Sequence, residues 1–359
     1  MSLLVSRRTL LAGSAAAVAA SALPGRLWAA DPLKVGFIYI GPIGDHGWTY
    51  AHEQGRLAVD RTFGDKVKTT YVENVPEGPD AERVLRQLAQ AGNELNFATS
   101  FGYMNPTLRA AKQLPKIKFE HATGYQTAPN LATYNARFYE GRAVCGTIAA
   151  NMTKTGIVGY LVSFPIPEVV MGVNAFTLAA QKIRPDIKVK VIWVNSWYDP
   201  GKESDATKAL IDGGADILVQ HTDSPAGMQV AESRNVYAFG QASDMRNFAP
   251  KMHLTSIVND WGGYYIERVQ AMLDGTWKTG SIWHGFKEGM IKMAPYNEVI
   301  PANVVEAAEK VRTGIADGSL HPFTGPVKNQ KGEEKIPAGQ TISDDDLLKM
   351  DWFVEGVQT

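Results

Sequence analysis

Acidic and aromatic residues recur directly after the apolar segments that are expected to form strands. Asp45 and Trp48 follow the first such segment, and Trp197 follows a similar one in the second half of the chain. Indole rings stack on flat rings and exclude water, while carboxylates accept hydrogen bonds from N–H, amino or hydroxyl groups. These residue types therefore favour binding of a flat heteroaromatic molecule. The full set of candidate binding residues is Trp48, Trp197, Asp45, Asp244, Phe101, Tyr103, Asp223 and Asn259.

Each of these residues also has a purely structural explanation. Asp45, Asp199 and Asp244 stand at strand-to-helix turns, where aspartate commonly caps the following helix. The two tryptophans could pack between a helix and a sheet, and Tyr103 could belong to the wall of a core. The recurrence of aromatic and acidic residues at the same point of both halves favours a binding site over these separate explanations.

Strand and helix patterns alternate from residue 33 onward, without hairpin turns between successive strands. This alternation predicts right-handed βαβ units and a parallel sheet. The pattern restarts at residue 156, after a helix that is expected to close the first unit, so two similar α/β lobes are expected. The expected strands are 33–40, 66–72, 96–99, 116–121, 156–162, 188–194, 216–220, 236–240 and 253–258. The expected helices are 48–59, 81–91, 106–113, 139–152, 167–183, 202–212 and 262–273.

The lobe boundaries follow from this restart. The first lobe is expected to comprise residues 31–152 with about 261–290, and the second residues 153–260 with about 291–359, joined by a hinge. Ligands of open parallel sheets bind beyond the carboxyl ends of the strands. All candidate residues stand at such ends, so we expect them to face one cleft between the lobes. Residues 325–340, rich in Gly, Lys and Pro, are expected to form a surface loop.

Length and composition agree with two globular lobes. The chain has 359 residues, of which 45% are hydrophobic and 20% charged. A single core rarely serves more than about 250–300 residues. The formal net charge of −1 gives no sign of the basic face that nucleic-acid binding requires, so no such partner is expected. The single cysteine, Cys145, excludes an intrachain disulfide and is expected to be an inert core thiol.

Motifs of common enzyme classes are absent from the sequence. It contains no G-x-G-x-x-G after a strand, no G-x-x-x-x-G-K, no G-x-S-x-G and no H-E-x-x-H. Dinucleotide binding, phosphate cradling, serine hydrolase chemistry and zinc hydrolysis therefore lack support. We expect a binding protein without a cofactor or metal ion, and not an enzyme.

The N-terminus resembles an export signal. Arg7 and Arg8 precede an apolar run at 10–23, which is typical of a twin-arginine signal of bacteria. The run is too short to span a membrane. Cleavage is expected near Ala29 or Ala30, and no cysteine there could carry a lipid, which predicts a protein free in the periplasm. An ordinary apolar N-terminal helix is the alternative.

Several motifs together resemble the basic membrane protein family, the substrate-binding components of ABC importers typified by bacterial purine-nucleoside receptors. The resemblance covers nearly all of the chain after the signal. It implies a type I periplasmic-binding-protein fold, an ABC permease of the inner membrane as partner, and a purine held between one aromatic residue of each lobe. The motifs, in chain order, are Lys34-Val35-Gly36-Phe37, Gly44-Asp45-x-x-Trp48, Tyr139-Glu140-Gly141, Gly172, Trp197-Tyr198-Asp199-Pro200, Gly214-Ala215-Asp216 and Leu254-Thr255-Ser256-Ile257-Val258.

The resemblance also assigns roles to single residues. Trp48 stands where the family carries a stacking Phe, Trp197 is the expected second stacking residue, and Asp45 and Asp244 match acidic positions of the cleft. The family's nucleoside receptors carry a Lys that helps to hold the sugar where this chain has Asn259. A second departure is Thr49, where the family commonly has Asn.

The loss of that ammonium group predicts that the ligand is a free nucleobase, adenine first, and not a nucleoside. A nucleoside, or another small solute such as a sugar or an autoinducer, stays open as an alternative, since related two-lobed proteins stack aromatics on sugar faces. An enzyme acting on a purine is a further alternative. The protein is expected to act as a monomer that closes around its ligand.

Overall fold

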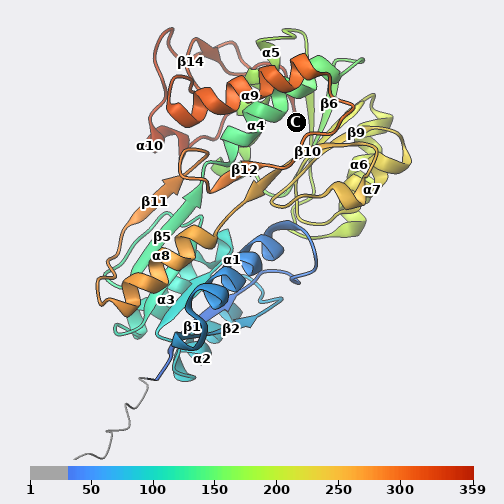
Figure 1. Ribbon diagram of the computed structural model, residues 1–359. Helices are drawn as coiled ribbons and strands as arrows, with labels where there is room; N and C mark the ends of the chain where they lie inside the picture. The colour runs from blue at the N-terminus through green and yellow to red at the C-terminus, as the bar shows by residue number, and fades with distance from the viewer. Residues whose placement is uncertain (1–30) are drawn as a thin grey trace, which may run out of the picture. The chain divides into compact units, whose positions relative to one another are not determined.

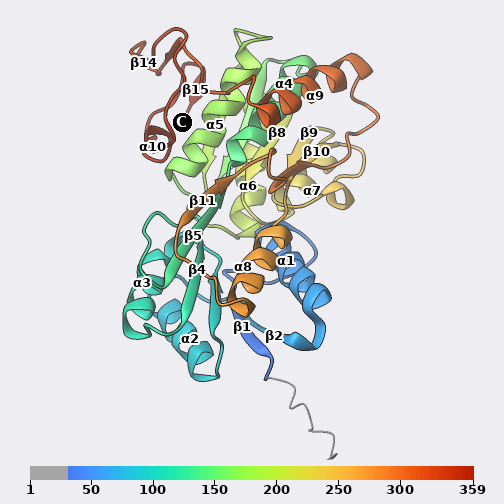
Figure 2. The ribbon, with the colours of Figure 1, turned by 60° about the vertical axis from the view of Figure 1, so that its left-hand side comes forward.

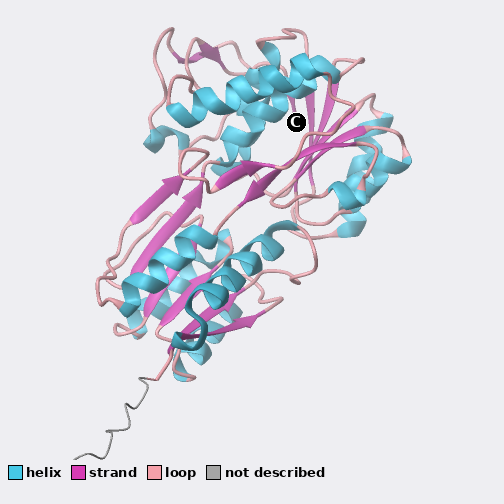
Figure 3. Ribbon diagram, viewed as in Figure 1, coloured by secondary structure: helices cyan, strands magenta, loops and turns pink. Residues whose placement is uncertain are grey.

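The structure is a computed structural model that describes residues 31–359, so the expected export signal lies outside the described residues. Two β-sheets, each covered by helices on both faces, make up this part of the chain (Figures 1 and 3). We call each sheet with its helices a lobe. None of the helices in residues 31–359 is both long and apolar enough to cross a membrane.

The sheet of the first lobe is parallel throughout. Its strands are β1 (Leu33–Ile38), β2 (Val67–Val72), β3 (Leu95–Ala98), β4 (Lys118–Ala122), β5 (Leu131–Ala136) and β11 (Ser281–His284). They lie in the order β11-β5-β4-β3-β1-β2. Successive strand side chains point to opposite faces. Phe37 accordingly packs in the core shared with α1 (Gly47–Phe63) and α8 (Gly262–Leu273), and Ile38 in the core shared with α2 (Pro79–Gln90) and α3 (Met104–Gln113).

The sheet of the second lobe repeats this plan. Its strands are β6 (Ile157–Val162), β7 (Lys188–Trp193), β8 (Ile217–His221), β9 (Tyr237–Gly240), β10 (His253–Asn259), β12 (Ile291–Met293) and β15 (Val357–Gln358). They lie in the order β12-β10-β9-β8-β6-β7-β15, and only β12 runs antiparallel. Tyr160 packs against Phe176 of α5 (Pro167–Gln181), while Leu161 packs on the other face with α6 (Pro200–Asp212) and α7 (Ala226–Ser233).

The chain crosses between the lobes three times. It leaves the first sheet after β5, returns after β10 through α8, and leaves again between β11 and β12 (Figure 2). The third crossing lies between β11, a strand of the first sheet, and β12, a strand of the second. Three short connections thus join the lobes, which is the arrangement of proteins whose domains close about a hinge.

The helix expected to close the first unit takes a different position. This helix, α4 (Phe138–Met152), packs mainly against α5 and α9 (Ala302–Asp317), and its side chains are buried on nearly all sides. A helix that is apolar all round needs neighbours all round. Cys145 lies in its interior, where burial raises the pKa of the thiol to about 12, as expected for an inert core cysteine.

The C-terminal segment covers one side of the second lobe (Figure 2). Residues 325–340, expected as a loop, contain a small hairpin of β13 (Val327–Lys328) and β14 (Glu334–Ile336). A short helix, α10 (Asp344–Leu347), follows, and β15 then pairs with β7 at the edge of the second sheet. Arg137, at the first crossover, forms an ion pair with Asp344 and so ties this segment to the hinge.

Candidate ligand-binding site

A cavity lies where the carboxyl ends of the two sheets face each other. Each strand end or first helical turn that borders it contributes one or two side chains. Both lobes take part equally, as expected when a ligand lies at the carboxyl ends of parallel strands. The lining residues are Ile40, Trp48, Ser100, Phe101 and Thr123 from the first lobe, and Glu168, Trp197, His221, Asp223 and Gln241 from the second.

Trp48 of α1 is held firmly in the first lobe. Its indole Nε1 donates a 2.6 Å hydrogen bond to the carbonyl oxygen of Thr99. Its ring meets those of His52 and Trp261 edge-on, with centroid distances of 4.4 and 5.5 Å. His52 in turn stacks on Trp261 at 4.7 Å. Aromatic neighbours and one polar anchor thus fix the orientation of the Trp48 ring before any ligand arrives.

Trp197 reaches the cavity from the loop between β7 and α6. Its ring lies 5.0 Å from that of Phe164, and its Nε1 donates a 3.2 Å hydrogen bond to Glu77 of the first lobe. Glu77 also accepts hydrogen bonds from the Ser100 hydroxyl and the Gly102 N–H. The contact between Trp197 and Glu77 therefore joins the two lobes at the rim of the cavity.

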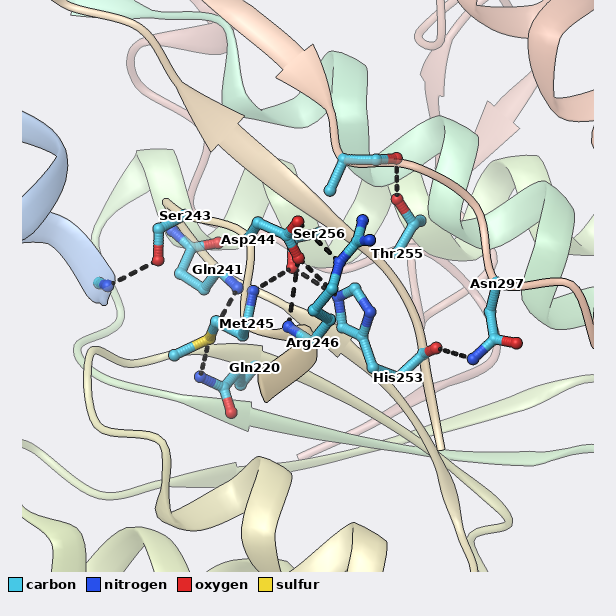
Figure 4. A network of polar contacts seen from close by, with 12 residues as sticks. Gln220, Gln241, Ser243, Asp244, Met245, Arg246, His253, Thr255, Ser256 and Asn297 are labelled. Atoms are coloured by element: carbon cyan, nitrogen blue, oxygen red, sulfur yellow. Dashed lines mark hydrogen bonds and ion pairs between the residues drawn. The ribbon is translucent and has the colours of Figure 1, made fainter. Parts of the chain in front are cut away.

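The N-terminus of α1 is capped by the opposite lobe. The cap residue of α1, His46, makes no side-chain capping bond. The hydroxyl of Ser243, which follows β9, accepts a 2.8 Å hydrogen bond from the Gly47 N–H instead (Figure 4). The backbone carbonyl of Asp223 also lies so close to Gly47 that a Cβ there would approach it to 2.7 Å. Capping satisfies orphan N–H donors of a helix, so the first turn of α1 is capped at the place where the two lobes meet.

Buried ionisable groups give the second-lobe wall its electrostatic character. Glu168, in the first turn of α5, has a side chain only 12% exposed, and its Oε1 lies 3.6 Å from Nε2 of His221. Burial raises the pKa of Glu168 to about 8, although the positive charge of Arg142 opposes this. Burial and the same guanidinium hold the pKa of His221 well below its usual range. Near neutral pH both groups are therefore uncharged.

Asp223 experiences a related environment. Burial raises the pKa of its carboxyl well above the usual range, and the negative charge of Glu203 adds to this rise. The backbone N–H of Trp48 acts in the opposite direction. Asp223 thus belongs to the second lobe but faces the first turn of α1.

Several buried polar atoms near these strand ends have no hydrogen-bond partner within residues 31–359. Two of them, Oε2 of Glu168 and Nδ1 of His221, belong to lining residues. Others are Oγ of Ser163, directly after β6, Oγ1 of Thr222, directly after β8, and both amide atoms of Asn259, the last residue of β10. Unpaired buried polar groups are costly, so this region is suited to a ligand with several polar atoms. Among the described residues no cluster of three or more His, Cys, Asp or Glu side chains could hold a metal ion.

Backbone strain is concentrated at the same place. Thr123, which lines the cavity, has a φ of 58°, and Ala242, between Gln241 and Ser243, has a φ of 62°. Left-handed backbone is rare for residues other than glycine, and particularly for a β-branched one. Such strain persists where the surrounding structure holds it, and it often marks binding sites.

A family comparison decides what kind of site this is. Residues 33–318 match the family described as "ABC transporter substrate-binding protein PnrA-like". The chain belongs to this family. It is therefore a substrate-binding protein of an ABC transporter, with a small molecule as ligand and a permease as partner, as the resemblance seen in the sequence implied.

Two relatives place this substrate-binding protein more closely. It is 58% identical over 342 residues to a protein of Brucella abortus (strain 2308) named "Purine-binding protein", covering 95% of this chain and 97% of that protein. It is 34% identical over 328 residues to a "Putative ABC transporter glucose-binding protein" of Haloferax volcanii, covering 91% of this chain and 81% of the relative.

Solved structures confirm the predicted fold of the substrate-binding protein. A solute-binding protein of an ABC transporter system from Aeropyrum pernix K1 superposes with a TM-score of 0.71 at 17% identity, covering 88% of this chain and 95% of that one. A second one, from Conexibacter woesei DSM 14684, superposes with a TM-score of 0.64 at 20% identity, covering 80% and 98%. The type I periplasmic-binding-protein fold, with two doubly wound lobes and a hinge, is thus confirmed.

Four of the candidate binding residues line the cavity of the substrate-binding protein. Trp48 and Phe101 do so from the first lobe, and Trp197 and Asp223 from the second. The two tryptophans thus reach one cavity from opposite lobes, and neither is enclosed within a helix–sheet core.

The other four candidates lie outside the lining. Asp45 is 80% exposed and pairs with its neighbour His46. Tyr103 is fully buried, and its hydroxyl donates a hydrogen bond to the Val75 carbonyl oxygen. Asp244 pairs with Arg246 at 2.9 Å on the surface (Figure 4).

The remaining candidate, Asn259, is buried at the end of β10, near the lobe crossover. The capping explanation is correct for Asp199, which is the N-cap of α6 and accepts a hydrogen bond from the Lys202 N–H.

Six lining residues were not predicted from the sequence, namely Ile40, Ser100, Thr123, Glu168, His221 and Gln241. Five of them stand directly at strand ends, where ligands of parallel sheets are expected to bind. Glu168 does not stand at a strand end, so a different feature of the sequence was needed to predict it. It occupies the first turn of α5, which follows the first strand of its lobe just as α1, with Trp48, follows the first strand of the other. The internal symmetry of the two lobes could have identified it.

Proposed function

We propose that the protein captures a free purine base, with adenine as the preferred ligand, and delivers it to an ABC importer. The observation that carries this proposal is that Trp48 and Trp197 line one cavity from opposite lobes. Two indoles so placed can stack on both faces of a flat ring. The name of the Brucella relative supports the same ligand class.

The lining of the cavity favours a base over a nucleoside. Asn259, at the position where nucleoside receptors of the family carry a Lys for the sugar, is buried and does not line the cavity. A ribose would thus find no charged donor at that position.

A second candidate ligand is a sugar, because the Haloferax relative is named for glucose and aromatic rings also pack against sugar faces. The polar atoms of Glu168, His221 and Asp223 could serve hydroxyl groups. Two large indoles facing one cavity fit a flat ring better than a puckered one, which is why we favour the purine. A nucleoside or an autoinducer is an alternative of the same kind, while turnover of a purine would need a nucleophile–base pair.

Ligand contacts to both lobes would stabilise the closed arrangement, which the permease then recognises. We assign residues 31–152 with about 261–290 to the first lobe and residues 153–260 with about 291–359 to the second, with α4 packed on the second. The twin-arginine signal would place the protein in the periplasm without a lipid anchor. We further propose that it acts as a monomer, without nucleic acid or cofactor, and that it is not an enzyme.

Mass spectrometry of small molecules released from the purified protein, followed by calorimetric titration, tests this proposal. We expect a purine among the released molecules, and tighter binding of adenine than of adenosine, with no measurable binding of glucose. Tighter binding of adenosine would refute the preference for a base. Binding of glucose without binding of any purine would refute the ligand class.

A further inference from the structure

Glu168 differs from the other lining residues in that its carboxyl group is enclosed but only partly used. Its side chain is 12% exposed, and the distance from Oε1 to His221 Nε2, 3.6 Å, is too long for a good hydrogen bond. Oε2 is buried and has no partner within the described part of the chain. The group therefore has free hydrogen-bonding capacity, and it belongs to a residue that lines the cavity.

Three elements present polar or charged groups to Glu168. Arg142 of α4 contributes a positive charge, Asn135 of β5 a side-chain amide, and His221 of β8 an imidazole. The Nη2 of Arg142 donates to Gln241, and this arginine forms no ion pair with Glu168 among the described residues. Burial prevails over the charge of Arg142 and raises the pKa of Glu168 to about 8. At pH 7 the carboxyl group therefore carries its proton for most of the time.

The protonation state determines which ligand edge Glu168 can bind. A neutral carboxylic acid offers one O–H donor and one C=O acceptor, whereas a carboxylate offers only acceptors. The neutral form complements an amidine edge, in which a ring nitrogen accepts and the adjacent amino group donates, as in adenine. A carboxylate instead complements an edge with two donors, such as the N1–H and amino group of guanine.

We propose that Glu168, as a neutral acid, binds the amidine edge of the ligand through a pair of hydrogen bonds and thereby selects adenine over guanine. This inference rests on the proposed capture of a purine base. His221 acts beside it as a neutral group, because burial holds the pKa of its imidazole well below the usual range. The mismatched edge would leave a buried polar group unpaired, which is the most effective way for a site to reject a similar molecule.

Calorimetric titration with adenine between pH 6.5 and 9 tests the inference. Because the pKa of Glu168 is raised to about 8, binding to the neutral acid is present below that pH and is lost above it. The neutral fraction falls about tenfold from pH 7 to pH 9, so we expect the association constant for adenine to fall about tenfold as well. Glu168→Gln keeps one donor and one acceptor but cannot ionise. It should retain the affinity at pH 7 within about threefold and remove the pH dependence, whereas Glu168→Ala should lose at least about tenfold at every pH.

A matched control is Glu140→Gln. Burial raises the pKa of Glu140 to about 7, but this residue accepts a hydrogen bond from the Phe286 N–H at the lobe crossover and does not line the cavity. The fall in adenine affinity between pH 7 and 9 should persist in this variant.

The outcomes separate the inference from the proposed function. If the unaltered protein binds no purine at any pH, the proposed function fails. If it binds adenine with the same affinity at pH 7 and 9, or if Glu168→Gln weakens adenine as strongly as Glu168→Ala does, the inference fails and the function stands. Persistence of the pH dependence in Glu168→Gln would assign it to another group and would also overturn the inference.

Discussion

The two lobes contribute chemically different walls to the same cavity. The first-lobe wall contains no ionisable side chain and consists of Ile40, Trp48, Ser100, Phe101 and Thr123. The second-lobe wall contains three ionisable side chains and consists of Glu168, Trp197, His221, Asp223 and Gln241. Apolar walls with a few well-placed polar groups are the usual composition of small-molecule sites. Here the two properties are divided between the lobes.

This division separates affinity from selectivity. The first-lobe wall is fixed in place, because Trp48 is held by the Thr99 carbonyl oxygen and by the rings of His52 and Trp261. The second-lobe wall carries unpaired atoms, at Glu168 and His221, that only a suitable ligand would satisfy. Loss of a stacking ring should therefore weaken all flat ligands alike, and changes to the ionisable side chains of the second lobe should alter the preference among them.

The largest effect in this series is expected from Trp48→Ala. Loss of one stacking partner should cost about 1–3 kcal/mol of binding free energy, or roughly 5- to 150-fold in affinity, for adenine and guanine alike. Titration calorimetry measures this loss. Trp193→Ala, which removes a half-buried indole packed near Phe353 at 6.2 Å and outside the cavity, is the control. Unchanged affinity in Trp48→Ala would remove Trp48 from the site.

A smaller loss, of about 1–2 kcal/mol, is expected from Trp197→Ala, because this ring lies on a part-exposed loop. Trp197→Phe keeps a stacking ring but removes the donor to Glu77, and it should recover most of the affinity. If Trp197→Phe and Glu77→Gln both bind adenine as weakly as Trp197→Ala does, the role of Trp197 is to join the lobes and not to stack on the ligand.

Ser243→Ala tests the cap that the second lobe supplies to α1. Loss of the bond to the Gly47 N–H should weaken adenine by about 1 kcal/mol, since that is the usual worth of a helix cap. The melting temperature without ligand should hardly change, because the cap forms only when the lobes meet. Ser343→Ala removes an ordinary cap, which accepts from the Asp346 N–H of α10. Ser343→Ala should lower the melting temperature and leave the affinity for adenine unchanged. A lowered melting temperature with unchanged affinity in Ser243→Ala would contradict the proposed role of the Ser243 cap.

The smallest effect is expected from Asp45→Ala. The side chain is 80% exposed and contacts only its neighbour His46 among the described residues. Surface substitutions of this kind usually change free energies by less than about 0.5 kcal/mol, so the affinity for adenine should change less than about threefold. A tenfold loss would instead place Asp45 in the site, at the acidic position that the family resemblance assigned to it.

Much of the fold could be predicted from the sequence, because alternating apolar strand and helix patterns indicate a succession of βα units. The strand β5 was missed, since Leu131–Ala136 includes polar Thr133 and Asn135 although every residue in it is buried. The helix α4 was recognised, but its packing on α5 and α9 depends on which faces its neighbours cover. Local periodicity does not contain that information.

The location of the site could be predicted better than the identity of the residues that line it. The rule for strand ends placed Trp48, Phe101, Trp197 and Asp223 near the cavity, and they line it. The same rule cannot distinguish a side chain that points into the cleft from one, such as Tyr103, that points beneath the loop. Burial of a carboxyl group such as that of Glu168 is likewise a property of the assembled lobes, and no local pattern in the sequence reveals it.

A crystal structure of the protein grown with adenine is the most direct test of the central claim. The account predicts one adenine in the cavity between the lobes, with the indole of Trp48 on one face of the purine and that of Trp197 on the other. An adenine bound elsewhere, or one whose faces meet neither indole, would contradict the account.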